Sequence, residues 1–146
     1  MIPEWFPLRL NLQVLEGVGQ TLGWEALFQI GVSVPQHAKF PPAITDLRGA
    51  MAALDVAFHM NHRRDGLVMY DAGTGGMLEG IGHYGCESGP DGRLIGRSTS
   101  VYPCAFDRGI FAGLVARFEP GSQVEHGPAA GCRTRDAAAC VYVVRR

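Results

Sequence analysis

The 146-residue sequence lacks the features that define several large classes of protein. Its formal net charge is only −1 and it has no long basic run, so nucleic acid is not expected as a partner. No stretch approaches the roughly 18 apolar residues that span a bilayer, and no membrane association is expected. The N-terminus has neither the basic start nor the continuous apolar run of a signal peptide, which predicts a cytoplasmic location.

The remaining composition is that of one ordinary globular domain. Apolar residues make up 47% and charged residues 18% of the chain, as in typical soluble folds. We therefore expect a single domain over residues 1–146, helical over 1–65 and built of a sheet and a helix over 66–146. In a cytoplasmic protein the four cysteines are expected to be thiols or metal ligands rather than disulfides.

Glycine, by contrast, is abundant, with 20 residues, many of them between 73 and 96. Such a stretch predicts turns and close backbone approaches. Residues 73–76 are not followed by a predicted helix and carry no Lys-Ser or Lys-Thr, which excludes a phosphate-binding loop. Glycine alternates with other residues over 80–83, and this predicts a strand whose backbone a helix or a ligand approaches closely.

Helical periodicity dominates the first part of the chain. The first thirty residues predict one or two short helices, with Gly31 as the C-terminal stop. The clearest helix spans about residues 42–63, and Pro42 suits its first turn. One apolar stripe recurs along it at spacings of three and four residues: Ile44, Leu47, Met51, Leu54 and Phe58.

A β-hairpin is expected in the second part of the chain. Residues 77–86 and 93–102 are predicted to form its two strands. Pro90-Asp91-Gly92 lies between them and is favourable turn chemistry.

One more helix and two more strands complete the expected fold. Apolar side chains repeat every four residues over about 105–118, so Phe106, Ile110 and Leu114 should be buried against the hairpin. A short strand near Val124 and a last strand over 138–144 follow. The sequence thus predicts an α+β fold, with N-terminal helices followed by an antiparallel sheet on which a helix packs.

Two groups of polar residues suggest chemistry. Asp55, His59 and His62 share one face of the predicted helix, and Glu79 and His83 share one face of the predicted strand. Imidazoles and carboxylates at such spacings can bind zinc or iron, or exchange protons near neutral pH. The alternative is a solvent-exposed helix end, which we favour because two arginines directly follow His62.

A family resemblance appears in the C-terminal third. Pro103-Cys104-Ala105-Phe106-Asp107-Arg108-Gly109 opens a helix, Cys132-Arg133-Thr134-Arg135 follows, and Cys140 lies eight residues after Cys132. Mainly over residues 76–146, this pattern resembles the 4-vinyl reductase-like domain, also called a hydrocarbon-binding domain. The resemblance implies a fold similar to that of haem nitric-oxide sensor domains and a role as a sensor module.

The resemblance also implies a structural zinc ion. In the aromatic-sensing relatives three cysteines and one glutamate hold it, and the matching cysteines are Cys104, Cys132 and Cys140. The position of the glutamate holds Ala129, so Glu125 or His126 would have to replace it. The Tyr-x-Ser-x-Arg motif of the haem-binding relatives does not occur in the sequence, which argues against haem.

The function expected from these observations is a sensor or carrier domain for an apolar or aromatic small molecule, rather than an enzyme. Its pocket would lie between the hairpin and the helices, lined by the mixed aromatic and aliphatic side chains typical of such sites: Phe58, Met77, Ile81, Tyr84, Phe106, Ile110 and Phe111. The alternative is a metal-dependent or acid–base enzyme that uses four side chains: His59, His62, Glu79 and His83. A third is a scaffold that forms a homodimer through its first helices.

Overall fold

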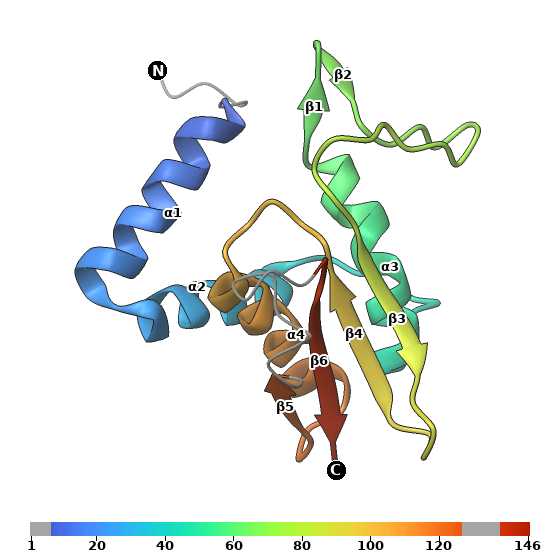
Figure 1. Cartoon of the computed structure of the whole chain (residues 1–146). Coiled ribbons are helices and arrows are strands. Elements are labelled where there is room, and N and C mark those ends of the chain that lie inside the picture. The colour runs from blue at the N-terminus through green and yellow to red at the C-terminus, as the bar shows by residue number, and fades with distance from the viewer. Residues whose placement is uncertain (1–6, 127–137) are drawn as a thin grey trace.

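The computed structural model describes residues 7–126 and 138–146 of the chain. Helices and antiparallel sheets follow one another as the α+β prediction requires, and the fold class is confirmed. Figure 1 shows the sheet with α3 and α4 close to it, and α1 standing apart and joined through α2. The elements are α1 (Leu8–Leu22), α2 (Trp24–His37), α3 (Leu47–Met60), β1 (Arg63–Arg64), β2 (Leu67–Val68), β3 (Tyr84–Ser88), β4 (Leu94–Ser98), α4 (Cys104–Phe118), β5 (Gln123–His126) and β6 (Cys140–Arg145).

The main sheet has the strand order β3-β4-β6-β5, and every pair in it is antiparallel. The predicted hairpin is therefore present as β3 and β4, and the last strand, β6, lies inside the sheet. Helix α4 packs on the sheet, where the Phe111 ring covers Gly96 and lies 5.1 Å from the Tyr142 ring. Ile110 and Leu114 are buried as predicted, whereas Phe106 is only half-buried.

Helix α3 is shorter than the sequence predicted, and both predicted ends were wrong. Asp46, and not Pro42, defines its start, because the Asp46 Oδ1 atom accepts a hydrogen bond from the Gly49 N–H at 2.8 Å. At the other end Asn61 takes the C-cap position. His62 and the arginines after it therefore lie beyond the helix.

Helix α2 runs past Gly31 to His37, so the predicted stop at Gly31 was wrong. Gly31 instead lies where α2 crosses α4, and a methyl group there would be 2.2 Å from the Phe106 carbonyl oxygen. Across the contact, a methyl group at Gly109 would lie 2.1 Å from the Phe28 carbonyl oxygen. Glycine at both positions lets the two helix backbones touch. At its C-terminal end, α2 is tied to α4 by Arg117, whose Nη1 donates to the carbonyl oxygens of Pro35 and Ala38, each at 2.6 Å.

Residues 77–83 are not a strand, contrary to prediction, and β3 begins only at Tyr84. Gly80 has φ 137° and Gly82 has φ 80°, conformations that break the strand geometry and that other residues rarely adopt. The close approach expected here is real, since a methyl group on Gly82 would lie 2.0 Å from the Thr99 carbonyl oxygen. The segment after β4 makes this approach, and not a helix or a ligand.

Helix α1 is attached to the rest of the molecule mainly through α2. Its buried residues are Leu15 and Gly19, and the Trp24 ring covers Gly19. Leu10, Val14 and Leu22 are exposed. None of the helices in the described ranges has both the length and the apolar character needed to cross a bilayer.

Candidate functional site

An open groove of about 680 Å³, referred to below as the α1 cavity, separates α1 from the segment that leads into α4. One wall is the inner side of α1, and the other is residues 101–103. Leu8, Leu12, Val101 and Pro103 give it apolar surface, and further along α1 polar side chains line its rim: Arg9, Gln13, Glu16 and Gln20. Its volume lies within the range of about 300–1,000 Å³ that is typical of small-molecule sites.

A chain of hydrogen bonds stands behind one wall of this cavity. The His62 Nδ1–H donates to the Phe58 carbonyl oxygen at 2.6 Å, which leaves Nε2 to accept the hydroxyl proton of Tyr102 at 2.7 Å. The Asn11 side chain of α1 donates to the same hydroxyl at 3.4 Å. Burial lowers the pKa of His62 and raises the pKa of Tyr102, so both side chains are neutral near pH 7.

Most of the residues expected to line a ligand pocket are found in the hydrophobic core. Five of them are buried and pack in one cluster: Phe58, Ile81, Tyr84, Ile110 and Phe111. Phe106 is half-buried beside that cluster, and Met77 lies in the loop before β3. None of the seven lines the α1 cavity, in which Tyr102 provides the aromatic wall. Their role as ligand contacts stays a prediction.

A buried carboxylate that the sequence analysis did not single out lies at the start of α4. Asp107 is fully buried and accepts hydrogen bonds from the hydroxyls of Tyr84 at 2.6 Å, Ser98 at 2.7 Å and Ser100 at 2.7 Å. Burial, and then the charge of Asp107, raises the pKa of Tyr84 well above its usual range. The signal was the alternation of two serines, Ser98 at the end of β4 and Ser100 just beyond it, both of which are buried and call for a buried polar partner.

Members of the two polar groups converge, and the expectation of a solvent-exposed face was wrong for His59, which is fully buried, whereas Glu79 is exposed. Asp55 and His59 lie one turn apart on α3, which packs against β3, and His83 immediately precedes β3. The Asp55 Oδ2 atom lies 2.7 Å from His83 Nδ1, and its Oδ1 accepts from the Tyr84 N–H at 3.0 Å. His62 is not part of the cluster, because α3 ends before it and its ring turns to Tyr102.

His83 lies between two carboxylates. Its Nε2 is 2.7 Å from the Glu79 Oε1 atom, and its Nδ1 faces Asp55. Carboxylate oxygens only accept, so both ring nitrogens must carry protons in this arrangement. The hydrogen bond to Glu79, and then that to Asp55, accordingly raises the pKa of His83, while the same contact with His83 lowers the pKa of Glu79.

His59 is the most buried member of the cluster, with no exposed surface. Its Nδ1–H donates to the Asp55 carbonyl oxygen at 2.8 Å, and its ring stacks on that of His83 with the ring centroids 4.8 Å apart. Its Nε2 is buried and has no hydrogen-bond partner among residues 7–126 and 138–146. Leaving such an atom unsatisfied costs roughly 1–3 kcal/mol.

Two of the three predicted cysteine ligands lie next to each other. Cys104 Sγ is 3.4 Å from Cys140 Sγ, and 3.1 Å from the Nε2 atom of His126. Of the two residues considered as replacements for the missing glutamate, His126 is therefore in place, whereas Glu125 pairs with Arg145. Cys132 and Ala129 lie outside the described residues.

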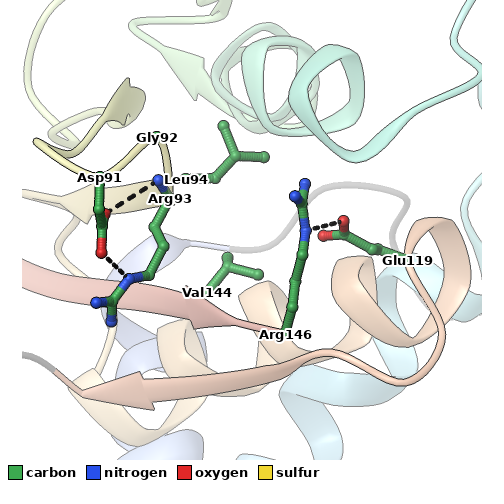
Figure 2. Close-up of a pocket in the computed structure, with 7 residues that line it drawn as sticks. All are labelled: Asp91, Gly92, Arg93, Leu94, Glu119, Val144 and Arg146. Atoms are coloured by element: carbon green, nitrogen blue, oxygen red, sulfur yellow. Dashed lines mark hydrogen bonds and ion pairs between the residues drawn. The ribbon is translucent and has the colours of Figure 1, made fainter.

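A second, smaller cavity of about 240 Å³ lies at the far end of the sheet (Figure 2). Leu94 and Val144 form its floor between two ion pairs, Asp91 with Arg93 and Glu119 with Arg146. Because all four charged side chains are engaged in pairs, a ligand would first have to break them, and we assign no role to this cavity.

Comparison with known proteins relates the fold to haem-binding domains. No family model and no curated protein matches the chain. A crystal structure of an H-NOX protein from S. oneidensis in the Fe(II)NO ligation state matches with a TM-score of 0.66 and 13% identity, over 97% of this chain and 77% of that one. A substituted variant in the Fe(II) state matches with a TM-score of 0.67 and 13% identity, over 97% and 74%. The NMR structure of an H-NOX domain from Shewanella oneidensis in the Fe(II)CO state matches with a TM-score of 0.59 and 14% identity, over 92% and 72%.

These matches confirm the expected relation in fold to haem nitric-oxide sensor domains. They also overturn the argument against haem, because chains with this fold bind haem and the absence of one motif therefore does not exclude it. Membership of the 4-vinyl reductase-like family stays a prediction.

Proposed function

We propose that this chain is a small-molecule-binding sensor domain whose ligand occupies the cavity between α1 and residues 101–103. The cavity itself carries the proposal, because its volume suits an extended apolar or aromatic molecule. Its two walls come from segments about 90 residues apart, so a ligand would join α1 to the rest of the fold. That coupling is what a sensor requires, since a ligand can shift only an equilibrium between states that it binds unequally.

Haem is the first ligand to test, because the structural neighbours are H-NOX proteins. The cavity fits it in two respects: Tyr102 belongs to the side-chain types that bind haem iron, and Arg9 on the rim could pair with a carboxylate of the ligand. When bound, haem would supply an iron atom for binding a diatomic gas. To hold it, Tyr102 would have to give up its hydrogen bonds to His62 and Asn11, because these keep the hydroxyl behind the cavity wall and burial raises the pKa of Tyr102.

The test is a binding titration of the purified full chain with haem and, separately, with an apolar fluorescent probe. We expect Leu12→Trp, which fills the cavity, to weaken binding by at least about tenfold, equivalent to roughly 1.4 kcal/mol. Leu10→Trp is the matched control, because Leu10 lies on the same helix but is exposed outside the cavity. Equal binding by both variants would place the ligand elsewhere.

We further propose that Cys104, Cys140 and His126 hold a structural metal ion, with zinc favoured by the sulfur and nitrogen ligands. The three ligand atoms lie within 4.8 Å of one another, which supports this assignment. Such an ion would fasten β5 and β6 to the start of α4. Metal analysis should show that Cys104→Ser loses bound zinc while Cys86→Ser, on β3 and outside the cluster, keeps it; equal zinc content in both would refute the assignment.

The homodimer expected from the sequence would use the outer side of the first helices, where Val14, Leu22 and Trp24 are exposed. Exposed apolar side chains on neighbouring helices, here α1 and the start of α2, are typical of such interfaces. Val14→Arg should then convert a dimer to a monomer in light scattering, and a wild-type chain that is already monomeric would remove this proposal.

A further inference from the structure

We propose that Asp55, His59 and His83 form a second metal-binding site, for a divalent first-row transition ion, on the side of the molecule where α3 meets β3. One ligand atom from each residue lies within 4.8 Å of the others. The site shares no residue with the α1 cavity or with the cysteine cluster.

The tautomer of His59 and its unsatisfied Nε2 atom support a metal site more strongly than the closeness of the three residues does. The backbone carbonyl of Asp55 accepts from Nδ1–H at 2.8 Å, which places the imidazole lone pair on Nε2. Histidines that bind metals commonly donate their other ring N–H to a carbonyl in this way, which fixes the tautomer. The buried Nε2, which has no hydrogen-bond partner among residues 7–126 and 138–146, thus has the tautomer and the missing contact expected of an empty ligand position.

The carboxylate is also held in a suitable orientation. Asp55 accepts from the Tyr84 N–H at 3.0 Å, and this bond anchors it to the first residue of β3. Its two oxygens lie 3.3 Å from His59 Nδ1 and 2.7 Å from His83 Nδ1, so one carboxylate lies against both imidazoles. Because the free lone pair of His59 is on Nε2 and not on the Nδ1 atom that faces Asp55, a shared ion requires rotation of the Asp55 and His83 side chains and the loss of one proton from His83.

The ligand types and their exposure define the class of ion. Two imidazoles and a carboxylate suit zinc, iron(II) or manganese(II), and not calcium, which prefers oxygen ligands, or copper(I), which prefers thiolates. His83 is 39% exposed and Glu79 is 71% exposed. The site is therefore closed on the His59 side and open on the other, where Glu79 or water would complete the coordination and a substrate could enter.

The experiment is a titration of the metal-free full chain with cobalt(II) alone, followed by absorption spectroscopy. Cobalt bound by sulfur gives intense charge-transfer bands, whereas an imidazole and carboxylate site gives only weak ligand-field bands, so the two proposed metal sites are counted separately. We expect His83→Gln and Asp55→Asn to bind cobalt at the imidazole and carboxylate site at least about tenfold more weakly than the wild type. The weak ligand-field bands should therefore be lost at a cobalt concentration that saturates the wild type. Cys104→Ser should leave that site unchanged.

His37→Gln is the matched control, because His37 is an exposed helical histidine whose Nδ1 also bonds the carbonyl four residues earlier. It should keep full binding. His83 is partly exposed, so its variant is expected to fold, and circular dichroism checks this. The proposal is overturned if the folded His83→Gln variant binds cobalt with the stoichiometry and affinity of the wild type, or if every cobalt ion bound by the wild type shows sulfur ligation.

Discussion

The contact between α2 and α4 allows a sharp test of how the first helices are held. Replacing Gly109 by alanine would place a methyl group 2.1 Å from the Phe28 carbonyl oxygen and 2.9 Å from the Gly31 Cα atom. Both neighbours are backbone atoms, which cannot rotate away, so the cost is at the upper end of the range for overpacking, about 3 kcal/mol.

Alanine also favours the helix over glycine by about 1 kcal/mol, which leaves a net loss of about 2 kcal/mol for Gly109→Ala. For a chain of this length that corresponds to a fall of about 4–8 °C in melting temperature. The measurement is thermal and urea unfolding followed by circular dichroism.

Gly17→Ala is the matched control on α1. A methyl group at Gly17 meets no atom of residues 7–126 and 138–146 within 4 Å, so only the helix-propensity gain is expected and stability should rise slightly. If Gly109→Ala were as stable as Gly17→Ala, the close packing of α2 on α4 would be refuted. Because α1 is attached mainly through α2, the same variant should also weaken ligand binding in the cavity.

Three further predictions concern individual side chains. Asp107→Ala should lower the free energy of unfolding in urea by about 3–5 kcal/mol, because three buried hydroxyls lose their acceptor. Asp91→Ala, at an exposed turn, is the control and should unfold like the wild type. An equal loss in both variants would contradict this prediction. Since burial lowers the pKa of His62 below 6.5, the unfolded chain takes up the proton first as the pH falls. Wild-type stability should therefore decline below pH 6.5 more steeply than that of His62→Gln, and parallel pH profiles would argue against a neutral, half-buried His62. Arg117→Ala should lower stability by about 1–2 kcal/mol, because two carbonyls at the end of α2 lose their donor, and an unchanged urea midpoint would show that these bonds do not hold α2.

The elements that the sequence predicted well are those with a strong local signal. The four-residue apolar repeat placed the helix at 105–118, within one residue of α4. The turn-forming residues around Asp91 correctly predicted the turn that joins β3 to β4 in the hairpin. Gly31 was wrongly predicted to end a helix, because glycine is favoured both at helix ends and where two helices cross. Only the position of α4 distinguishes the two cases.

The candidate sites depended on contacts between distant segments, which periodicity does not contain. Spacing along α3 put Asp55 and His59 on one face, yet only the packing of α3 on β3 brings His83 to them. The two arginines after His62 suggested an exposed face, but α3 ends at Met60, so their exposure says nothing about His59. The α1 cavity was missed because its two walls come from segments about 90 residues apart, which no local pattern brings together.

The position of β6 inside the sheet has a consequence for how the protein is made. Within residues 7–126 and 138–146, strand β5 pairs only with β6, and β4 pairs with β3 and β6, so both strands need residues 140–145 before these backbone hydrogen bonds can form. During synthesis the hairpin and α4 can form early, but the sheet cannot close until residues 140–145 have been made. Until then β4 and β5 present unpaired edges, which invite pairing with other chains. A chain arrested before residue 140 would therefore combine helices and the β3–β4 hairpin with an open, aggregation-prone sheet edge, rather than form a shortened version of the native domain.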